Sequence, residues 1–377
     1  MDSSESNSLI MKKIFKLFTL AAVAGLAACT GKPGYVITGT VESAADGDTV
    51  YLQTLEGWNF VNLDTAVIAN GKFTFEGVQD TAAYRYLSCK VGDKEFLRTD
   101  FFLENGNITA NLGKESSSVT GTLSNDAYQE ISSQLKAIYP QLREIRATFA
   151  KGGLTDAQRD SLGNIYKELD QKMTQVNMDG LRKNITNAVG VYLLKSNYYS
   201  MDIAELDTLL PKIAPEFKAD ERVQKIESYV SSIKATAVGQ KFTDFAMKDL
   251  EGKDVKLSDY AGKGKVIVVD FWASWCGPCR AGMPALKETY KKFKGDNFEI
   301  VGVSLDKDME AWAKAVKDLG LEWAHMSDLK FWDCEGARLY GVNAIPALVV
   351  IDKDGTIAAR DIHGEELNAK IAELLAK

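Results

Sequence analysis

The sequence predicts a chain of three consecutive parts: an antiparallel β domain, a helical region and an α/β domain. Three observations support this organisation. Apolar and polar residues alternate, as they do in strands, over much of residues 35–122. Apolar residues recur at helical spacing over residues 123–236. From residue 238 onwards strand-like and helix-like segments alternate, which is typical of α/β domains. With 377 residues, the chain is also too long for one hydrophobic core.

The first 28 residues have the pattern of a signal peptide. A basic segment over residues 11–16 precedes an apolar stretch over residues 17–26, which is too short to span a bilayer as a stable helix. Because residues 1–10 are polar and precede this pattern, Met11 is the expected true start.

Cys29 follows Leu26-Ala27-Ala28, which resembles a bacterial lipobox. This pattern predicts cleavage before Cys29, a lipid anchor on its sulfur and a tether over residues 29–34; a plain signal peptide that contains a cysteine is the alternative. Thr30 stands where many lipoproteins of the inner membrane have Asp, which favours the outer membrane. We therefore expect a lipoprotein of the cell envelope that faces the oxidising periplasm.

Residues 35–122 are expected to form a small antiparallel β-sandwich or barrel. Short alternating segments follow one another, and Asn70-Gly71 separates two of them, which predicts a hairpin. Cys89 alternates in phase with Leu87 and Val91, so it is expected to be a buried, inert thiol. No cluster of His, Asp or Glu suggests a site in this part.

Residues 123–236 are expected to be helical. Apolar residues form stripes at helical spacing, and Thr155 to Gln158 match a capping box after Gly152-Gly153. Because amphipathic stripes usually face a core, a spacer or scaffold that packs on the β domain is favoured over a surface for dimerisation or substrate docking.

Cys276 and Cys279 stand at a predicted strand-to-helix junction. The apolar, β-branched run over residues 265–271 predicts a buried strand, and the pattern after Cys279 is helical. Cys276 thus falls at a helix N-terminus, where unpaired N–H groups and the helix dipole favour a thiolate. We expect Cys276 to attack a disulfide and Cys279, one turn later, to resolve the mixed disulfide.

A zinc site would also use two cysteines at this spacing, but it needs further ligands. Cys334 is the only other cysteine in this part of the chain, and no His cluster accompanies it. The pattern therefore indicates a redox dithiol that uses no metal and no cofactor. His325 and His363 are given no role, and Cys334 is expected to be a free thiol rather than a third redox centre.

The segment Trp275-Cys276-Gly277-Pro278-Cys279 closely resembles the active site of the thioredoxin family. The likeness covers about residues 238–377. It extends to Asp270 in the preceding strand, to Pro284 in the following helix and to the segment around Ile345-Pro346.

This resemblance implies roles for individual residues. Asp270 is implied to relay protons to or from Cys279, although it could be an ordinary carboxylate at a strand edge. Pro346 is implied to follow a cis peptide bond, which exposes backbone groups to which a substrate peptide can pair. The residues implied to bind substrate are Trp275, Gly277, Pro278, Ile345 and Pro346.

Two further likenesses concern the architecture. A strand–helix segment over about residues 298–326 resembles the insertion that membrane-anchored oxidoreductases of the TlpA/ResA type add to the thioredoxin fold. Residues 35–122 resemble a β-rich domain of unknown function that precedes thioredoxin domains in many Gram-negative lipoproteins.

The residues between the two cysteines indicate the direction of the chemistry. Gly277-Pro278 is the pair found in thioredoxin, a reductant with a potential of roughly −270 mV, whereas strong oxidants of this fold usually carry other residues there. We therefore expect an enzyme that reduces disulfides of envelope proteins. The family resemblance makes apocytochrome c one candidate substrate, and the unidentified electron donor is expected to be a membrane thiol-transfer protein.

Two alternatives stay open: a disulfide oxidase or isomerase, and a non-enzymatic envelope-binding lipoprotein that uses the fold as a scaffold. A nucleic-acid partner is not expected, because the formal net charge is −7 and no basic stripe is present. Since residues 35–236 show no catalytic set, residues 238–377 alone are expected to reduce a generic disulfide.

Overall fold

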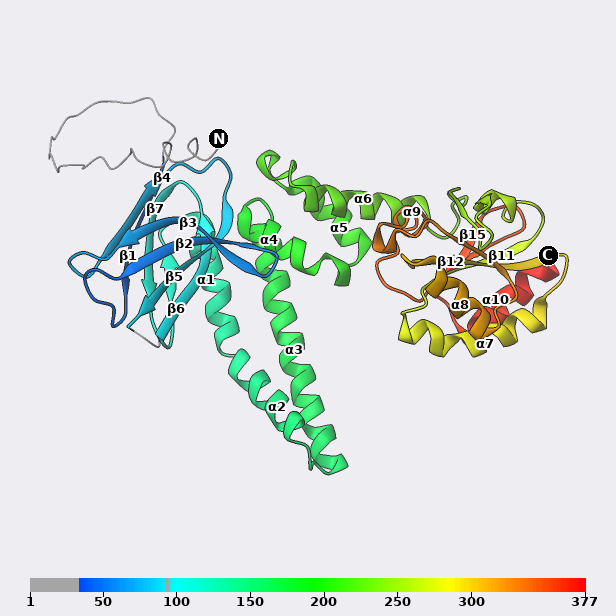
Figure 1. Ribbon diagram of the computed structural model, residues 1–377, viewed down its shortest axis with the longest axis horizontal. Coiled ribbons are helices and arrows are strands. Elements are labelled where there is room, and N and C mark those ends of the chain that lie inside the picture. Colours follow the sequence, from blue (N-terminus) through cyan, green and yellow to red (C-terminus); the bar gives the residue numbers. More distant parts are fainter. Residues whose placement is uncertain (1–33, 93–94) are drawn as a thin grey trace, which may run out of the picture.

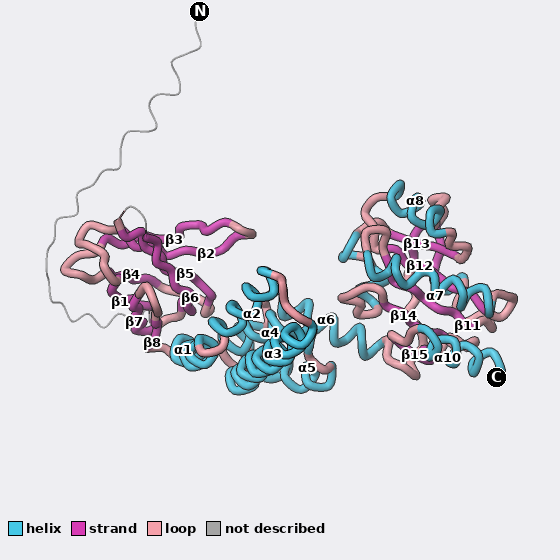
Figure 2. The backbone as a smooth tube through the Cα atoms, turned by 90° about the horizontal axis from the view of Figure 1, so that it is seen from below, coloured by secondary structure: helices cyan, strands magenta, loops and turns pink. Residues whose placement is uncertain are grey.

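The computed structural model describes residues 34–92 and 95–377. The expected signal peptide and the lipidation site at Cys29 therefore lie outside the described residues. Figures 1 and 2 show a β-rich part at one end of the molecule, an α/β part at the other and helices between them, as the sequence predicts. Among the described residues, no helix has the length and apolar character needed to cross a membrane.

The β-rich part consists of two four-stranded sheets with the strand orders β4-β1-β7-β8 and β3-β2-β5-β6. Side chains such as Ile37, Leu87 and Phe101 are buried between them. Cys89 is a free thiol and is fully buried, as expected. The strands are β1 (Tyr35–Val41), β2 (Thr49–Glu56), β3 (Asn59–Val67), β4 (Phe73–Gly77), β5 (Ala83–Val91), β6 (Glu95–Leu103), β7 (Gly106–Leu112) and β8 (Ser118–Thr120).

Two pairings in this part differ from the sequence-based expectation. Asn70 and Gly71 do form a tight turn, with φ of 52° and 71°, but the strands beside it pair with β2 and β1 in different sheets. Only one bridge, Ala69 to Lys72, closes the expected hairpin. In addition, β1 and β7 run parallel. This is possible because they are not consecutive in the chain, and the strands between them, most of which lie in the other sheet, bring the chain back in the same direction.

The helical region packs on the β-rich part. Phe102 of β6 belongs to the helical core. The Asn125 side chain accepts a hydrogen bond from the Phe102 N–H at 2.9 Å and donates one to the Phe102 carbonyl oxygen at 2.8 Å. The capping box at Thr155 and Gln158 is present. The helices are α1 (Leu123–Lys136), α2 (Tyr139–Lys151), α3 (Asp156–Asn184), α4 (Ala188–Asn197), α5 (Ile203–Leu209) and α6 (Glu221–Ala235), with 3₁₀ turns at Tyr198–Ser200, Leu210–Lys212 and Pro215–Phe217.

The α/β part is built on a seven-stranded mixed sheet with the order β10-β9-β13-β12-β11-β14-β15. The central strand β11 is buried along its whole length, and it pairs parallel with β12 and antiparallel with β14. The strands are β9 (Ala246–Lys248), β10 (Asp254–Lys256), β11 (Val266–Trp272), β12 (Phe298–Ser304), β13 (Ala324–Ser327), β14 (Ala347–Ile351) and β15 (Ile357–Arg360).

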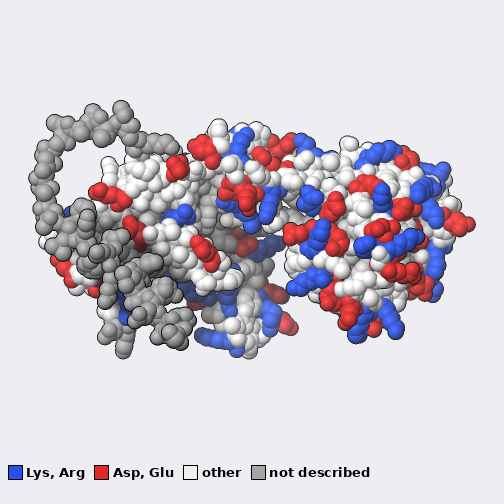
Figure 3. All heavy atoms as spheres, turned by 45° about the horizontal axis from the view of Figure 1, so that its top comes forward, with Lys and Arg blue, Asp and Glu red and all other residues white. Residues whose placement is uncertain are grey.

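Helices cover this sheet. The two longest, α7 and α10, lie side by side and are joined by a 2.8 Å hydrogen bond from Thr289 to Asn368. The helices are α7 (Gly277–Phe293), α8 (Met309–Leu319), α9 (Glu335–Leu339) and α10 (Gly364–Ala376), with 3₁₀ turns at Leu257–Asp259 and Phe331–Asp333. Figure 3 shows Lys and Arg side chains interspersed with Asp and Glu over the visible face of this part.

The end of α6 is attached to the α/β part. The Arg360 guanidinium donates to the Thr236 carbonyl and hydroxyl oxygens, at 2.9 and 2.6 Å, and to the Tyr340 carbonyl at 2.6 Å. Gly341 lies so close to Ile233 that a Cβ on Gly341 would come within 2.6 Å of that side chain. A fragment that begins at residue 238 lacks these contacts.

Candidate active site

Cys276 and Cys279 form a disulfide where β11 leads into α7, with an S–S distance of 2.02 Å. Cys276 is the N-cap of α7, and the Cys279 N–H donates to its sulfur at 3.1 Å. Both residues are buried, with exposed fractions of 4% for Cys276 and 2% for Cys279. This N–H would also stabilise a Cys276 thiolate in the reduced protein, because free donors at a helix N-terminus favour negative charge.

A loop distant in the sequence faces this pair. The Ile345–Pro346 peptide bond is cis, as the family resemblance implies, and the Ile345 carbonyl oxygen lies 3.7 Å from the Cys276 sulfur. Pro346 is exposed, as are Gly277 and Pro278, which follow Cys276 in the chain. The fold therefore brings together the residues expected to line a substrate groove, and it places a backbone carbonyl beside the Cys276 sulfur.

Asp270 lies in the middle of β11 with its carboxyl group buried. It exposes only 2% of its surface, and its Oδ2 atom has no hydrogen-bond partner among the described residues. Burial raises the pKa of Asp270 to about 7, because the charged form is poorly solvated there. Asp270 is therefore not the ordinary edge carboxylate of the alternative interpretation, and it can exchange a proton near neutral pH.

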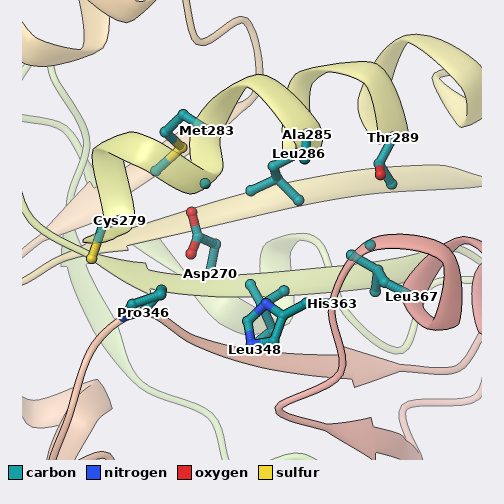
Figure 4. Close-up of a pocket in the computed structure, with 12 residues that line it drawn as sticks. Asp270, Cys279, Met283, Ala285, Leu286, Thr289, Pro346, Leu348, His363 and Leu367 are labelled. Carbon is teal, nitrogen blue, oxygen red and sulfur yellow. The ribbon is translucent and has the colours of Figure 1, made fainter. Parts of the chain in front are cut away.

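A cavity of about 120 Å³ connects Asp270 with the disulfide. Figure 4 shows Asp270 on the strand below α7, with Cys279 at one end of the cavity and His363 at its lower edge. The other lining residues are mostly apolar, including Met283, Leu286 and Leu348. Asp270 and Cys279 therefore share one small, mostly apolar space.

Comparisons with known proteins agree with this geometry. Residues 238–360 match the AhpC/TSA family, and residues 35–128 match a domain of unknown function, DUF4369. The chain is 33% identical over 151 residues to the thiol-disulfide oxidoreductase ResA of Bacillus cereus (strain ATCC 10987 / NRS 248), covering 40% of this chain and 84% of that protein. ResA of Bacillus subtilis (strain 168) is 30% identical over 119 residues, covering 32% of this chain and 64% of that protein.

The chain belongs to the ResA-related thiol-disulfide oxidoreductases. A solved thiol-disulfide oxidoreductase from Bacteroides fragilis NCTC 9343 is 33% identical and covers 36% of this chain and 99% of its own, with a TM-score of 0.34. Because of this family membership the protein is a thioredoxin-like enzyme, and its α/β part follows a β-rich part and a helical region.

The reaction of such an oxidoreductase can be followed through these residues. In the direction expected from the sequence, the Cys276 thiolate of the reduced protein would attack a substrate disulfide, form a mixed disulfide and release one substrate thiol. The Cys279 thiolate would then attack the Cys276 sulfur, which would release the second substrate thiol and form the Cys276–Cys279 disulfide present in this structure. In this direction the substrate would gain two electrons and the enzyme would lose two.

Cys334 and His325 of the α/β part are not part of the dithiol. Cys334 is a free thiol, fully buried, and burial raises its pKa to about 12, so it resists ionisation. His325 is buried between Trp272 and Trp323, and burial lowers its pKa to about 4. No group of three or more potential metal ligands occurs within the described part of the chain.

Sequence reasoning missed two aromatic residues beside the dithiol. Phe331 and Trp332 lie in a 3₁₀ turn that precedes α9. Their rings contact Trp275, the residue before Cys276. Two adjacent aromatic residues in an otherwise polar stretch, Lys330-Phe331-Trp332-Asp333, were the available signal.

Proposed function

We propose that this oxidoreductase acts as a reductant and transfers electrons to disulfides in proteins of the cell envelope. The Gly277-Pro278 pair carries this proposal. A strong oxidant of this fold has a reduced form that is stabilised, which makes its disulfide easy to reduce. Neither Gly277 nor Pro278 has a side-chain donor that could stabilise a Cys276 thiolate. The disulfide is therefore comparatively stable and the dithiol is a reductant.

We assign Asp270 the role of proton acceptor for Cys279. A buried thiol resists ionisation, so the second step needs a base near Cys279. Asp270 lines the same cavity as Cys279, and a pKa of about 7 suits a group that takes up and returns protons near neutral pH. Trp275, Gly277, Pro278, Ile345 and Pro346 are assigned to substrate binding, since they surround the attacking sulfur.

The location rests on the N-terminal sequence. A signal peptide and a lipid anchor on Cys29 would place the enzyme on a membrane facing the periplasm, with the outer membrane favoured by Thr30. In that oxidising compartment a reductant needs an electron supply, which a membrane thiol-transfer protein would provide. Apocytochrome c is one candidate among the envelope disulfide substrates.

Membership of an oxidoreductase family argues against a purely non-enzymatic scaffold. An oxidase or isomerase has the same two cysteines, so the direction of transfer must be measured. The reduced full-length protein should reduce the disulfides of insulin in a single turnover, and the oxidised protein should not introduce disulfides into a reduced protein at a comparable rate. The opposite result would identify an oxidase.

Partners can be captured with Cys279→Ala, which blocks the second step. This variant should accumulate mixed disulfides through Cys276 with envelope proteins, and the bands should disappear on treatment with dithiothreitol. Cys276→Ala is the matched control, because it removes the attacking sulfur and should capture nothing. Equal capture by both variants would reject the assignment of Cys276 as the nucleophile.

A further inference from the structure

Three aromatic side chains form an exposed cluster beside the active-site disulfide. Trp275 precedes Cys276, whereas Phe331 and Trp332 come from the 3₁₀ turn before α9. Their ring centroids are 5.0 Å apart for Trp275 and Phe331, 6.0 Å for Trp275 and Trp332, and 6.1 Å for Phe331 and Trp332. Each ring therefore contacts the other two, and we call these three residues the aromatic triad.

The aromatic triad is unusually open to solvent. Trp275, Phe331 and Trp332 expose 45%, 38% and 40% of their surface. By contrast, Trp272, Trp312 and Trp323 of the same part of the chain are buried. Clustered aromatic side chains that stay in water are characteristic of binding surfaces, since their burial against a partner removes a large apolar area from water.

The turn that carries Phe331 and Trp332 is held in place before any partner arrives. The Asp328 carboxylate accepts hydrogen bonds from the backbone N–H groups of Lys330 and Glu335, at 3.2 and 2.9 Å. The Ser327 hydroxyl accepts one from the Leu329 N–H at 3.1 Å. These bonds tie both ends of the turn, so its two rings are presented with little conformational freedom to lose on binding.

The backbone of this turn is also strained. Leu329 and Phe331 both have φ of 56°, in the left-handed region that bulky side chains rarely adopt. Such conformations persist where the surrounding structure enforces them, and they concentrate at functional sites. Nothing in the core requires the Phe331 side chain, because it lies at the surface and not in the apolar cluster of this part.

We propose that the aromatic triad recognises the polypeptide segment that flanks the reactive cysteine of a protein substrate, and that it selects an apolar or aromatic side chain there. The proposal rests on the reductase function proposed above and adds substrate selection to it. Its residues are Phe331 and Trp332, together with Trp275.

The position of the attacking sulfur identifies the occupant. A substrate in a mixed disulfide is covalently bonded to Cys276, so its chain must pass over the residues that border this sulfur. The Ile345 carbonyl oxygen lies 3.7 Å from this sulfur. Trp275 is the neighbour of Cys276 in the chain and belongs to the aromatic triad. The aromatic triad is thus continuous with the substrate groove.

Charge does not explain the selection as well as apolar contact does. Lys307 lies 5.8 Å from the centroid of the Phe331 ring, while Lys330 and Asp333 flank the two rings with opposite charges. Lys307 and Lys330 disfavour a cationic substrate residue and Asp333 disfavours an anionic one, which leaves apolar and aromatic residues as the best fit. Buried aromatic contacts of this kind are among the strongest contributors to binding in protein interfaces.

The test uses two peptides that differ at one position. Each contains a single cysteine blocked as a mixed disulfide with thionitrobenzoate, whose release is followed by absorbance; one peptide has Trp next to the cysteine and the other has Ser. The reduced full-length protein should react with the Trp peptide roughly five to ten times faster in kcat/KM. The difference should arise mainly in KM.

Variants then assign this preference to the aromatic triad. Phe331→Asn removes the first ring with a residue that tolerates the left-handed backbone, and Trp332→Ser removes the second ring. The double variant should react with both peptides at similar rates. Trp332→Phe should retain most of the preference. Trp58→Ser is the matched control, because Trp58 is 97% exposed in the β-rich part and should leave the preference unchanged.

The outcomes separate this inference from the proposed function. If the wild-type protein reduces both peptides at equal rates, or if the double variant keeps the full preference, the inference is wrong while the reductase function stands. If the wild-type protein reduces neither peptide, the reductase function itself fails. Should the double variant unfold, as judged by circular dichroism, Trp332→Ser against Trp332→Phe decides the question.

Discussion

Replacing Asp270 by Asn tests whether this carboxyl group is as poorly solvated as its burial indicates. The side chain is buried within β11, its Oδ2 atom has no hydrogen-bond partner among the described residues, and its pKa is raised to about 7. Asn has nearly the same shape but does not titrate. The comparison should be made on the oxidised protein, in which the Cys276–Cys279 disulfide cannot titrate.

The sign of the effect follows from linkage. The carboxyl pKa is 3.8 in the unfolded chain and about 7 in the folded protein, so the folded state keeps its proton over a range of pH in which the unfolded state has lost it. The titration of Asp270 therefore costs no stability below pH 3.8, and stability is lost as the pH rises from 3.8 towards 7. A shift of about 3 pKa units corresponds to roughly 4 kcal/mol of unfolding free energy.

The assay is urea unfolding of wild type and Asp270→Asn at several values between pH 4 and pH 8. The free energy of unfolding of the variant, relative to wild type, should rise with pH by up to about 4 kcal/mol and level off above pH 7. Any pH-independent difference reflects the buried amide and is not part of the prediction. A difference that stays flat over this range would refute a raised pKa.

Asp306→Asn is the matched control. Asp306 is equally buried, with 2% of its surface exposed, but its carboxylate accepts hydrogen bonds from the Ser274 N–H at 2.9 Å, from the Ser274 hydroxyl and from the Ser304 hydroxyl at 2.7 Å. This variant should be less stable than wild type at neutral pH, because it removes an acceptor of charge-assisted hydrogen bonds. Asp306→Asn should thus lose stability at neutral pH, whereas the stability of Asp270→Asn relative to wild type should rise with pH.

Three further outcomes are expected. His325, whose pKa falls from 6.5 unfolded to about 4 folded, should cause stability to be lost as the pH falls from 6.5 to 4; His325→Leu should remove roughly 3 kcal/mol of this dependence in urea unfolding. Arg360→Met should destabilise the full chain by roughly 2 kcal/mol in the same assay, whereas Arg338→Met, at an exposed position, should have little effect. In single-turnover kinetics, Asp270→Asn should slow resolution of the mixed disulfide by roughly a hundredfold and leave the first attack by Cys276 comparatively intact; an unchanged resolution rate would remove Asp270 from the catalytic role.

The local features of this protein could be predicted from its sequence. The strand β11, the cysteine pair at the start of α7 and the cap at Thr155 all depend on residues a few positions apart, so short patterns reveal them. The cis bond before Pro346 was expected from a family resemblance, because no local pattern of this segment distinguishes it from a trans proline.

The features that were missed depend on contacts between distant segments. The turn at Asn70-Gly71 has the expected conformation, but which sheet each neighbouring strand joins depends on the packing of the whole sandwich. Similarly, Trp275 and Phe331 are far apart in sequence, and the positive φ of Phe331 that shapes the turn is not encoded by a glycine. The attachment of Arg360 to Thr236 follows only from the way α6 meets the α/β part.

The reduction potential of the Cys276–Cys279 disulfide tests the central claim most directly. The full-length protein is equilibrated in glutathione buffers of defined ratio, and the reduced fraction is quantified by alkylation and mass spectrometry. A reductant with Gly277-Pro278 between its cysteines should be well below the roughly −180 mV of a disulfide isomerase and close to the roughly −270 mV of thioredoxin. A value near roughly −120 mV, which is typical of a strong oxidant, would contradict the assignment and identify the protein as an oxidase.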